Sequence, residues 1–185
     1  LSERIGARIW LPHALIHEAL ALYAQGHAKD ALDLGREAAT LAAQSSAALL
    51  GAWVHGALAT MSPDRATVDE ALNDGDRLID QGCVGHNQLW FYRMAADACM
   101  RVANWNGART YAERMERYTA SEPMLWNQFF GARAKALARW CSGARDAALR
   151  AEMERLGWQG EGLGFHVPAR GIRAALNDPA SLTDA

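Results

Sequence analysis

The stretch from Gly82 to Arg93 holds the densest set of residues in this chain that could carry chemistry. Two turn glycines are followed by a histidine and an asparagine able to cap a helix, then by three aromatic residues and an arginine. Cys83 and His86 lie close in sequence, but a thiol nucleophile needs a base oriented by a third group, together with an oxyanion hole. The sequence identifies no such partners. We therefore expect no catalytic residue and interpret the stretch as a candidate binding element.

Two further patterns could hold a metal or a cofactor. His13 and His17 are four residues apart, on one face of a helix, but no third or fourth metal ligand lies near them. The segment Gly157–Gly164 is rich in glycine, as phosphate-binding loops are, yet it lacks the Gly-Lys-Ser/Thr ending and follows no strand. We expect no metal and no cofactor, and we predict that Gly157–Gly164 is a flexible connector.

Composition excludes several classes of partner. The 185 residues carry a net charge of −2, with basic residues scattered among acids, which argues against nucleic acid. The three cysteines are odd in number and show no CxxC spacing, as expected for reduced thiols in the cytoplasm. No apolar run reaches the roughly 18–20 residues of a membrane span, and no secretory signal opens the chain. The start at Leu1, within helical sequence, suggests a fragment of a longer protein.

The elements that must position these residues are all helical. Alanine is abundant, proline is rare and period-2 alternation is absent, so we predict an all-α fold. Pro12, Ser45-Ser46 and Ser62-Pro63-Asp64 are helix-start signals, and His86 or Asn87 could cap a further helix. The expected helices span residues 12–25, 28–43, 47–61, 64–81, 88–103, 105–119, 123–140, 144–156 and 168–176.

These helices are predicted to form repeated hairpins. In Gly26–Leu32 and Gly143–Leu149, a turn glycine is followed five residues later by an alanine. Such a small residue would let two helices approach closely. The corresponding alanines are Ala31, Ala71, Ala108 and Ala148, spaced by 40, 37 and 40 residues. Such a period predicts a right-handed α-solenoid of about four hairpins, similar to tetratricopeptide repeats although their period is about 34, with HEAT-like stacking as the alternative. One domain would cover residues 1–176, with pairs at 9–43, 46–81, 87–120 and 124–157, a capping helix at 168–176 and a polar tail at 177–185.

The repeat register also selects a candidate groove. In a tetratricopeptide-like array the first helix of each pair lines the concave face. The positions eighteen residues before the four alanines are His13, Trp53, Trp90 and Phe130. Extending this register, we expect a groove suited to a peptide, formed by Trp53, Trp90, Arg93, Asp97, Met100, Phe130, Arg133 and Trp140. The alternative is that these aromatics pack between repeats and that the arginines pair with acids such as Asp97. Tyr92 should face the core.

Several segments share a further likeness with a known family. They are Trp10–His13 with Ala24–Leu32, Gly82–Asn87 with Leu89–Arg93, and Tyr118-Thr119, Glu122-Pro123, Trp126, Phe129-Phe130 and Ala132-Arg133. Together they resemble the tetratricopeptide-type C-terminal region of bacterial class III adenylate/guanylate cyclases, from about Ile9 to Leu156. In that family an N-terminal domain makes cyclic nucleotide, and the repeats regulate or scaffold. This chain lacks a cyclase domain, so the resemblance transfers no catalytic residue.

Together, these observations predict a non-catalytic, cytoplasmic interaction or regulatory module. Its partner would be a protein or peptide segment, which could belong to upstream domains of a cyclase-like parent, and not nucleic acid or membrane. Two alternatives remain open. One is a structural or dimerising array, in which Trp53, Trp90 and Phe130 would be buried. The other is a sensor of a small acidic ligand, which would need an enclosed pocket near Arg93 and Arg133.

Overall fold

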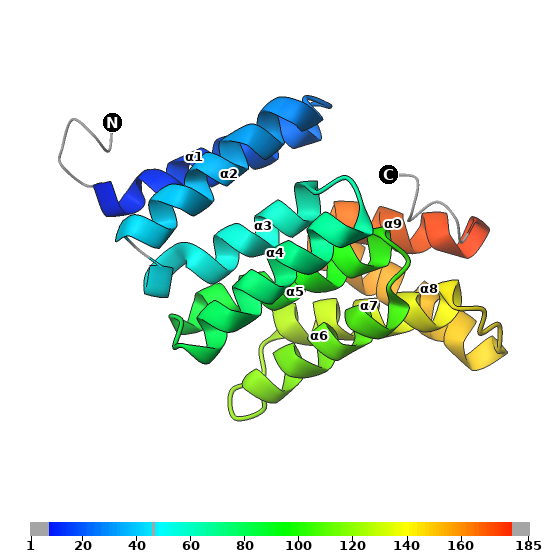
Figure 1. Ribbon diagram of the computed structural model, residues 1–185. Helices are drawn as coiled ribbons and strands as arrows, with labels where there is room; N and C mark the ends of the chain where they lie inside the picture. Colours follow the sequence, from blue (N-terminus) through cyan, green and yellow to red (C-terminus); the bar gives the residue numbers. More distant parts are fainter. Residues whose placement is uncertain (1–7, 46, 179–185) are drawn as a thin grey trace. The chain divides into compact units, whose positions relative to one another are not determined.

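The computed structural model describes residues 8–45 and 47–178, and nearly all of them are helical (Figure 1). No strand occurs within these ranges, so the predicted all-α class is confirmed. The predicted cap at Ser46 and most of the predicted tail, 179–185, lie outside the described residues. The α-helices are α1 (Leu11–Ala24), α2 (Ala28–Ser45), α3 (Ala52–Met61), α4 (Arg65–Asp80), α5 (Gly85–Arg101), α6 (Trp105–Tyr118), α7 (Leu125–Cys141), α8 (Ala147–Gly162) and α9 (His166–Asn177).

The chain divides into two compact units. The first unit ends at Ala95 and the second begins at Ala96, so the division falls within α5. Two short segments complete the first unit: a 3₁₀ turn at Arg8–Trp10 and a π-helical segment at Ala47–Gly51, just before α3.

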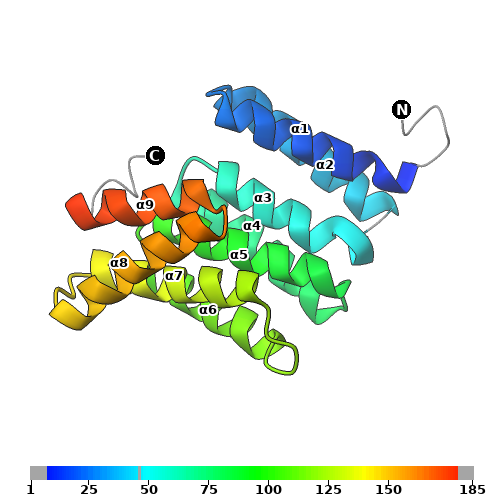
Figure 2. The same cartoon turned by 180° about the vertical axis from the view of Figure 1, so that it is seen from behind.

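Antiparallel hairpins build the first unit (Figures 1 and 2). Helix α1 pairs with α2, and α3 pairs with α4, while α1 and α2 both contact α3. Phe91 of α5 is fully buried against Gly56 of α3 and Gly75 of α4. A Cβ atom on Gly75 would lie 2.7 Å from Cζ of Phe91, so only glycine leaves room for this ring. The glycines thus allow α5 to pack closely on the second hairpin.

The α1–α2 hairpin turns through a left-handed residue. Gly26 has φ +87°, and the following His27 N–H donates to the Leu22 carbonyl at 2.9 Å, which closes the helix end in a Schellman motif. Five residues after Gly26, Ala31 is fully buried. The predicted glycine-to-alanine spacing therefore does define a close hairpin here.

The same turn, followed five residues later by a buried alanine, recurs twice in the second unit. Ala103 (φ +54°) stands five residues before buried Ala108, and Gly164 (φ +79°) stands five residues before buried Ala169. In both cases the next residue's N–H donates at 2.8 Å to the carbonyl five residues back. Helices α8 and α9 therefore form a hairpin of the α1–α2 kind, in which α9 is a full partner of α8.

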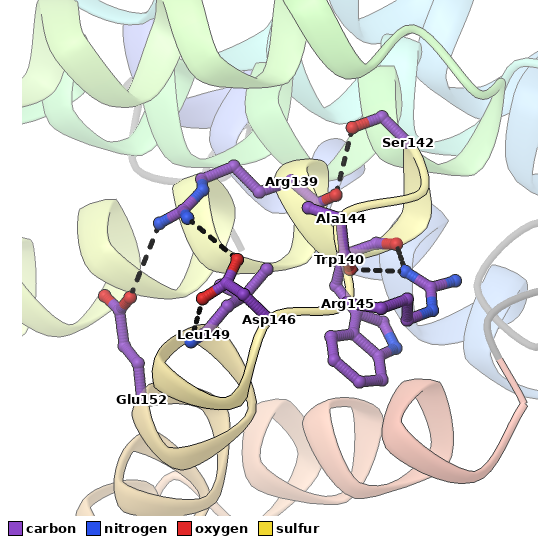
Figure 3. A network of polar contacts seen from close by, with 8 residues as sticks. All are labelled: Arg139, Trp140, Ser142, Ala144, Arg145, Asp146, Leu149 and Glu152. Atoms are coloured by element: carbon purple, nitrogen blue, oxygen red, sulfur yellow. Dashed lines mark hydrogen bonds and ion pairs between the residues drawn. The ribbon is translucent and has the colours of Figure 1, made fainter.

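The α7–α8 turn begins in the same way, with Gly143 at φ +110° and the Ala144 N–H donating to the Arg139 carbonyl at 3.0 Å, but the next helix starts later (Figure 3). Asp146 caps α8 by accepting from the Leu149 N–H at 2.9 Å, so the helix begins at Ala147. The chain thus takes two more residues between Gly143 and the helix than between Gly26 and α2. Ala148 is therefore exposed, and Leu149 is buried in its place. The prediction that Ala148 mediates close helix approach is wrong, because the turn is longer than its glycine suggests.

The prediction of a flexible connector at Gly157–Gly164 is also wrong. Helix α8 continues through this segment to Gly162, and Gly157 and Gly160 are buried within it. A Cβ atom on Gly160 would lie 2.9 Å from Cζ of Phe129 and 3.1 Å from Cβ of Ala169. Glycine here serves close packing, and tertiary contacts outweigh its poor helix propensity of about 1 kcal/mol.

Candidate functional site

A cavity of about 420 Å³ opens in the first unit, between residues of α1, the π-helical segment, α3 and α5. Its wall is rich in aromatic and hydrogen-bonding side chains. They are Trp10, Trp53, Trp90, His13, His17, His86, Asn87 and Arg93, with Leu20, Leu49, Leu50 and Met94 as the apolar remainder. None of these lining residues is acidic.

One side of the cavity is a cluster of rings from α1 and α3. The Trp53 ring centroid lies 4.9 Å from that of His13 and 5.1 Å from that of His17, and the two histidine rings are 4.6 Å apart. Burial lowers the pKa of His13, and the neighbouring His17 lowers it further. Trp53 is only 5% exposed, and its indole N–H finds no hydrogen-bond acceptor among the described residues. The cluster therefore holds an unsatisfied buried donor, a group that normally has a partner.

The opposite side comes from the start of α5. Asn87, which is buried, donates its side-chain N–H to the Leu49 carbonyl and so ties α5 to the π-helical segment. Gln88 donates to the Cys83 carbonyl at 3.1 Å. Helix α5 begins at Gly85, earlier than predicted, so Asn87 lies inside the helix rather than at its cap. This side chain fixes the position of the cavity wall.

Trp90 and Arg93 follow on the same face of α5. Trp90 is 41% exposed, and the Arg93 guanidinium carbon lies 6.0 Å from the centroid of its ring, within cation–π range. Tyr92 is buried, as expected, and so is Phe91. Three predicted groove residues, Trp53, Trp90 and Arg93, thus line one cavity.

The other five predicted groove residues lie in the second unit. Arg133, only 8% exposed, places Nη1 2.5 Å from Oδ1 of Asp97. This is the ion pair that the packing alternative expected for Asp97. Met100 and Phe130 are buried. None of these four lines the cavity of the first unit.

Trp140 is also buried, and its contacts are with other parts of the same unit (Figure 3). Its indole N–H donates to the Ala175 carbonyl of α9 at 2.8 Å. The Arg145 guanidinium carbon lies 4.4 Å from the centroid of a Trp140 ring, and Arg145 donates to the Trp140 carbonyl. Trp140 therefore holds the α7–α8 turn and α9 together.

No family model, curated protein or solved structure matches this chain. The chemistry of the site therefore has to follow from its own residues. Burial raises the pKa of the Cys83 and Cys141 thiols, the opposite of what a thiolate nucleophile requires. In the described part of the chain, no cluster of three or more His, Cys, Asp or Glu residues could hold a metal ion. No helix in the same residues is long and apolar enough to cross a membrane.

The groove prediction missed Trp10, His86 and Asn87, and one repeat signal points to the last of these. The pattern Asn87-x-x-Trp90-x-x-Arg93 recurs forty residues later as Asn127-x-x-Phe130-x-x-Arg133. Asn127 is 1% exposed, and its amide has no hydrogen-bond partner among the described residues. Including asparagine in the repeat would have placed Asn87 beside Trp90 and Arg93.

Proposed function

We propose that this chain is a non-catalytic, tetratricopeptide-like interaction module that binds a protein or peptide segment. The recurring left-handed turn followed by a buried alanine supports the repeat architecture, because α1–α2, α5–α6 and α8–α9 share it. Each such hairpin buries its apolar stripe only by stacking on a neighbour, which is how solenoids grow.

The cavity of the first unit carries the binding proposal. At about 420 Å³ it falls near the lower end of the range of ligand pockets, large enough for an anchoring side chain and its neighbours. Tryptophan and arginine dominate protein-binding hot spots because they combine large contact area with directional donors. Trp90 and Arg93 offer that combination at the cavity, and Trp90 is partly exposed.

The resemblance to the C-terminal region of class III cyclases supports a regulatory setting. We propose that the module belongs to a bacterial, cytoplasmic signalling protein whose cyclase domain lies outside this chain. Its partner would then be an upstream domain of the same protein, and the module would regulate or scaffold cyclic nucleotide synthesis.

A sensor of a small acidic ligand is the second candidate, favoured by the absence of acidic residues among those lining the cavity. The structural alternative expects Trp53, Trp90 and Phe130 to be buried; Trp53 and Phe130 are buried, which supports it, whereas Trp90 is 41% exposed. Neither alternative requires a partner protein, so partner capture separates both from the main proposal.

Capture experiments with the whole chain test the main proposal. The immobilised chain is incubated with cell lysate and, separately, with the purified cyclase domain of the parent. We expect Trp90→Ala and Arg93→Ala to weaken capture of the same protein at least tenfold, with unchanged circular dichroism. Trp158→Ala, at a 76% exposed tryptophan of the second unit, is the matched control and should have no effect. Capture that survives both cavity variants would contradict the proposal.

A further inference from the structure

The first-unit cavity has aromatic walls, a positively charged arginine and no acidic lining residue. Three tryptophans and three histidines line it, so ring-bearing residues make up half of its twelve lining residues. A flat ligand group can stack on such walls, whereas a branched aliphatic group leaves part of each ring face uncovered. The wall therefore favours an aromatic group over an aliphatic one.

The polar groups of the wall favour negative charge. Arg93 is cationic, and His13, His17 and His86 can each donate a hydrogen bond, while no lining residue is acidic. The buried Trp53 indole N–H adds a donor that has no acceptor among the described residues. A cationic ligand would meet the like charge of Arg93 and no carboxylate among the lining residues, which is unfavourable in a partly enclosed site.

Aromatic and charged groups lie close together in this wall. The Arg93 guanidinium carbon is 6.0 Å from the Trp90 ring centroid. A ring stacked beside Trp90 therefore lies close to the guanidinium, and a carboxylate on the neighbouring residue of the same peptide can fold back onto Arg93. Arginine holds a carboxylate with two parallel hydrogen bonds, which fixes its orientation.

We propose that the cavity binds an aromatic side chain next to a carboxylate, as in a peptide segment where tryptophan, tyrosine or phenylalanine adjoins aspartate or glutamate. This inference rests on the proposed peptide-binding function and names the anchor that the site accepts. A free aromatic carboxylic acid presents the same chemistry, so the experiment must separate the two sources.

Isothermal titration of the whole chain with matched probes makes this separation. The peptide probes are acetylated, amidated hexapeptides with a central tryptophan-glutamate, tryptophan-lysine or leucine-glutamate pair. The small probes are indole-3-propionate and tryptamine. We expect the tryptophan-glutamate peptide to bind at least tenfold more tightly than the other two peptides, and more tightly than indole-3-propionate.

Three variants assign the preference to the cavity. Arg93→Gln should remove the preference for glutamate over lysine, and Arg93→Lys should restore part of it. Trp53→Phe keeps a ring in the wall but removes the orphan donor, so it should weaken binding of the glutamate peptide selectively. Arg65→Gln is the control, because Arg65 is 61% exposed on α4 and does not line the cavity. Thermal melts establish that each variant is folded.

Each outcome has a distinct meaning. Equal affinity for the three peptides, or a glutamate preference that survives Arg93→Gln, overturns the inference. If a partner is captured through Trp90 and Arg93 without this preference, the proposed function stands and only the inference fails. Tight binding of indole-3-propionate without binding of any peptide overturns the peptide anchor and favours a small-molecule sensor. If no probe binds and no partner is captured, both proposals fail.

Discussion

Arg133 Nη1 lies 2.5 Å from Asp97 Oδ1, and this ion pair joins α7 to the last turns of α5 within the second unit. The Arg133 side chain is 10% exposed and that of Asp97 is 26% exposed. Replacing Asp97 by asparagine would leave a largely buried guanidinium without its counter-charge. We expect Asp97→Asn to lower the free energy of unfolding by about 2 kcal/mol, measured by urea denaturation.

An exposed pair provides the control for this change. Asp33 lies 2.8 Å from Lys29, but both side chains are more than half exposed. Asp33→Asn should therefore have no measurable effect on the urea midpoint, because solvent screens exposed pairs. Equal effects of the two substitutions would show that the Arg133–Asp97 contact does not stabilise the fold.

Replacing two glycines of α8 by alanine should change the free energy of unfolding in opposite directions. A Cβ atom on Gly157 would have its nearest neighbour at 3.9 Å, so Gly157→Ala should gain about 0.5–1 kcal/mol from better helix propensity. Gly160→Ala would place its Cβ atom against Phe129 and Ala169 and should lose about 1–3 kcal/mol. Thermal denaturation measures both. If this segment were a flexible connector, both substitutions would be nearly neutral.

Ala103 occupies a turn position that Gly26 and Gly164 fill in the equivalent hairpins, and it keeps their left-handed conformation. A left-handed alanine costs about 1 kcal/mol relative to glycine. Ala103→Gly should therefore raise stability by up to about 1 kcal/mol. Gly26→Ala should lower it by a similar amount, since a Cβ atom there meets nothing within 4 Å and only the backbone is strained. A stability loss in Ala103→Gly, measured by thermal denaturation, would contradict this account.

Helix class and most helix boundaries were predictable from local patterns, because alanine content, proline spacing and caps such as Asp64 act within one turn. The exceptions were positions where distant packing decides. In the sequence, the glycines at 157 and 160 predict a flexible segment. In the structure, Phe129 and Ala169 pack closely against Gly160. Turn length after Gly143 depended on the Asp146 cap, which displaced Ala148 from the core.

The candidate site was predictable only in part. Repeat spacing identified Trp53, Trp90 and Arg93, which lie at one cavity. The same spacing could not show that Trp140 is enclosed, because its partners Ala175 and Arg145 come from outside the aligned positions. Periodicity shows which positions are equivalent, whereas exposure depends on what each unit packs against them.

Stability should also depend on pH near neutrality, through His55 of α3. Burial lowers the pKa of His55, Asp74 opposes this shift, and Arg77 adds to it. Between pH 7 and 5 the unfolded chain therefore takes up a proton at this site that the folded chain resists. The free energy of unfolding should fall as pH falls through 6.5, by at most about 1.4 kcal/mol per pH unit for one proton. His13, whose pKa is also lowered, contributes with the same sign.

Urea denaturation at pH 7, 6 and 5 measures this dependence in the wild type and in His55→Gln. The variant removes the titrating group but keeps a polar side chain of similar size. We expect its unfolding free energy to fall less steeply with decreasing pH, because only His13 and the remaining groups still titrate. Most carboxylates titrate below this range, so their contribution is small above pH 5. Identical slopes in the two proteins would exclude His55 as a source of the pH dependence.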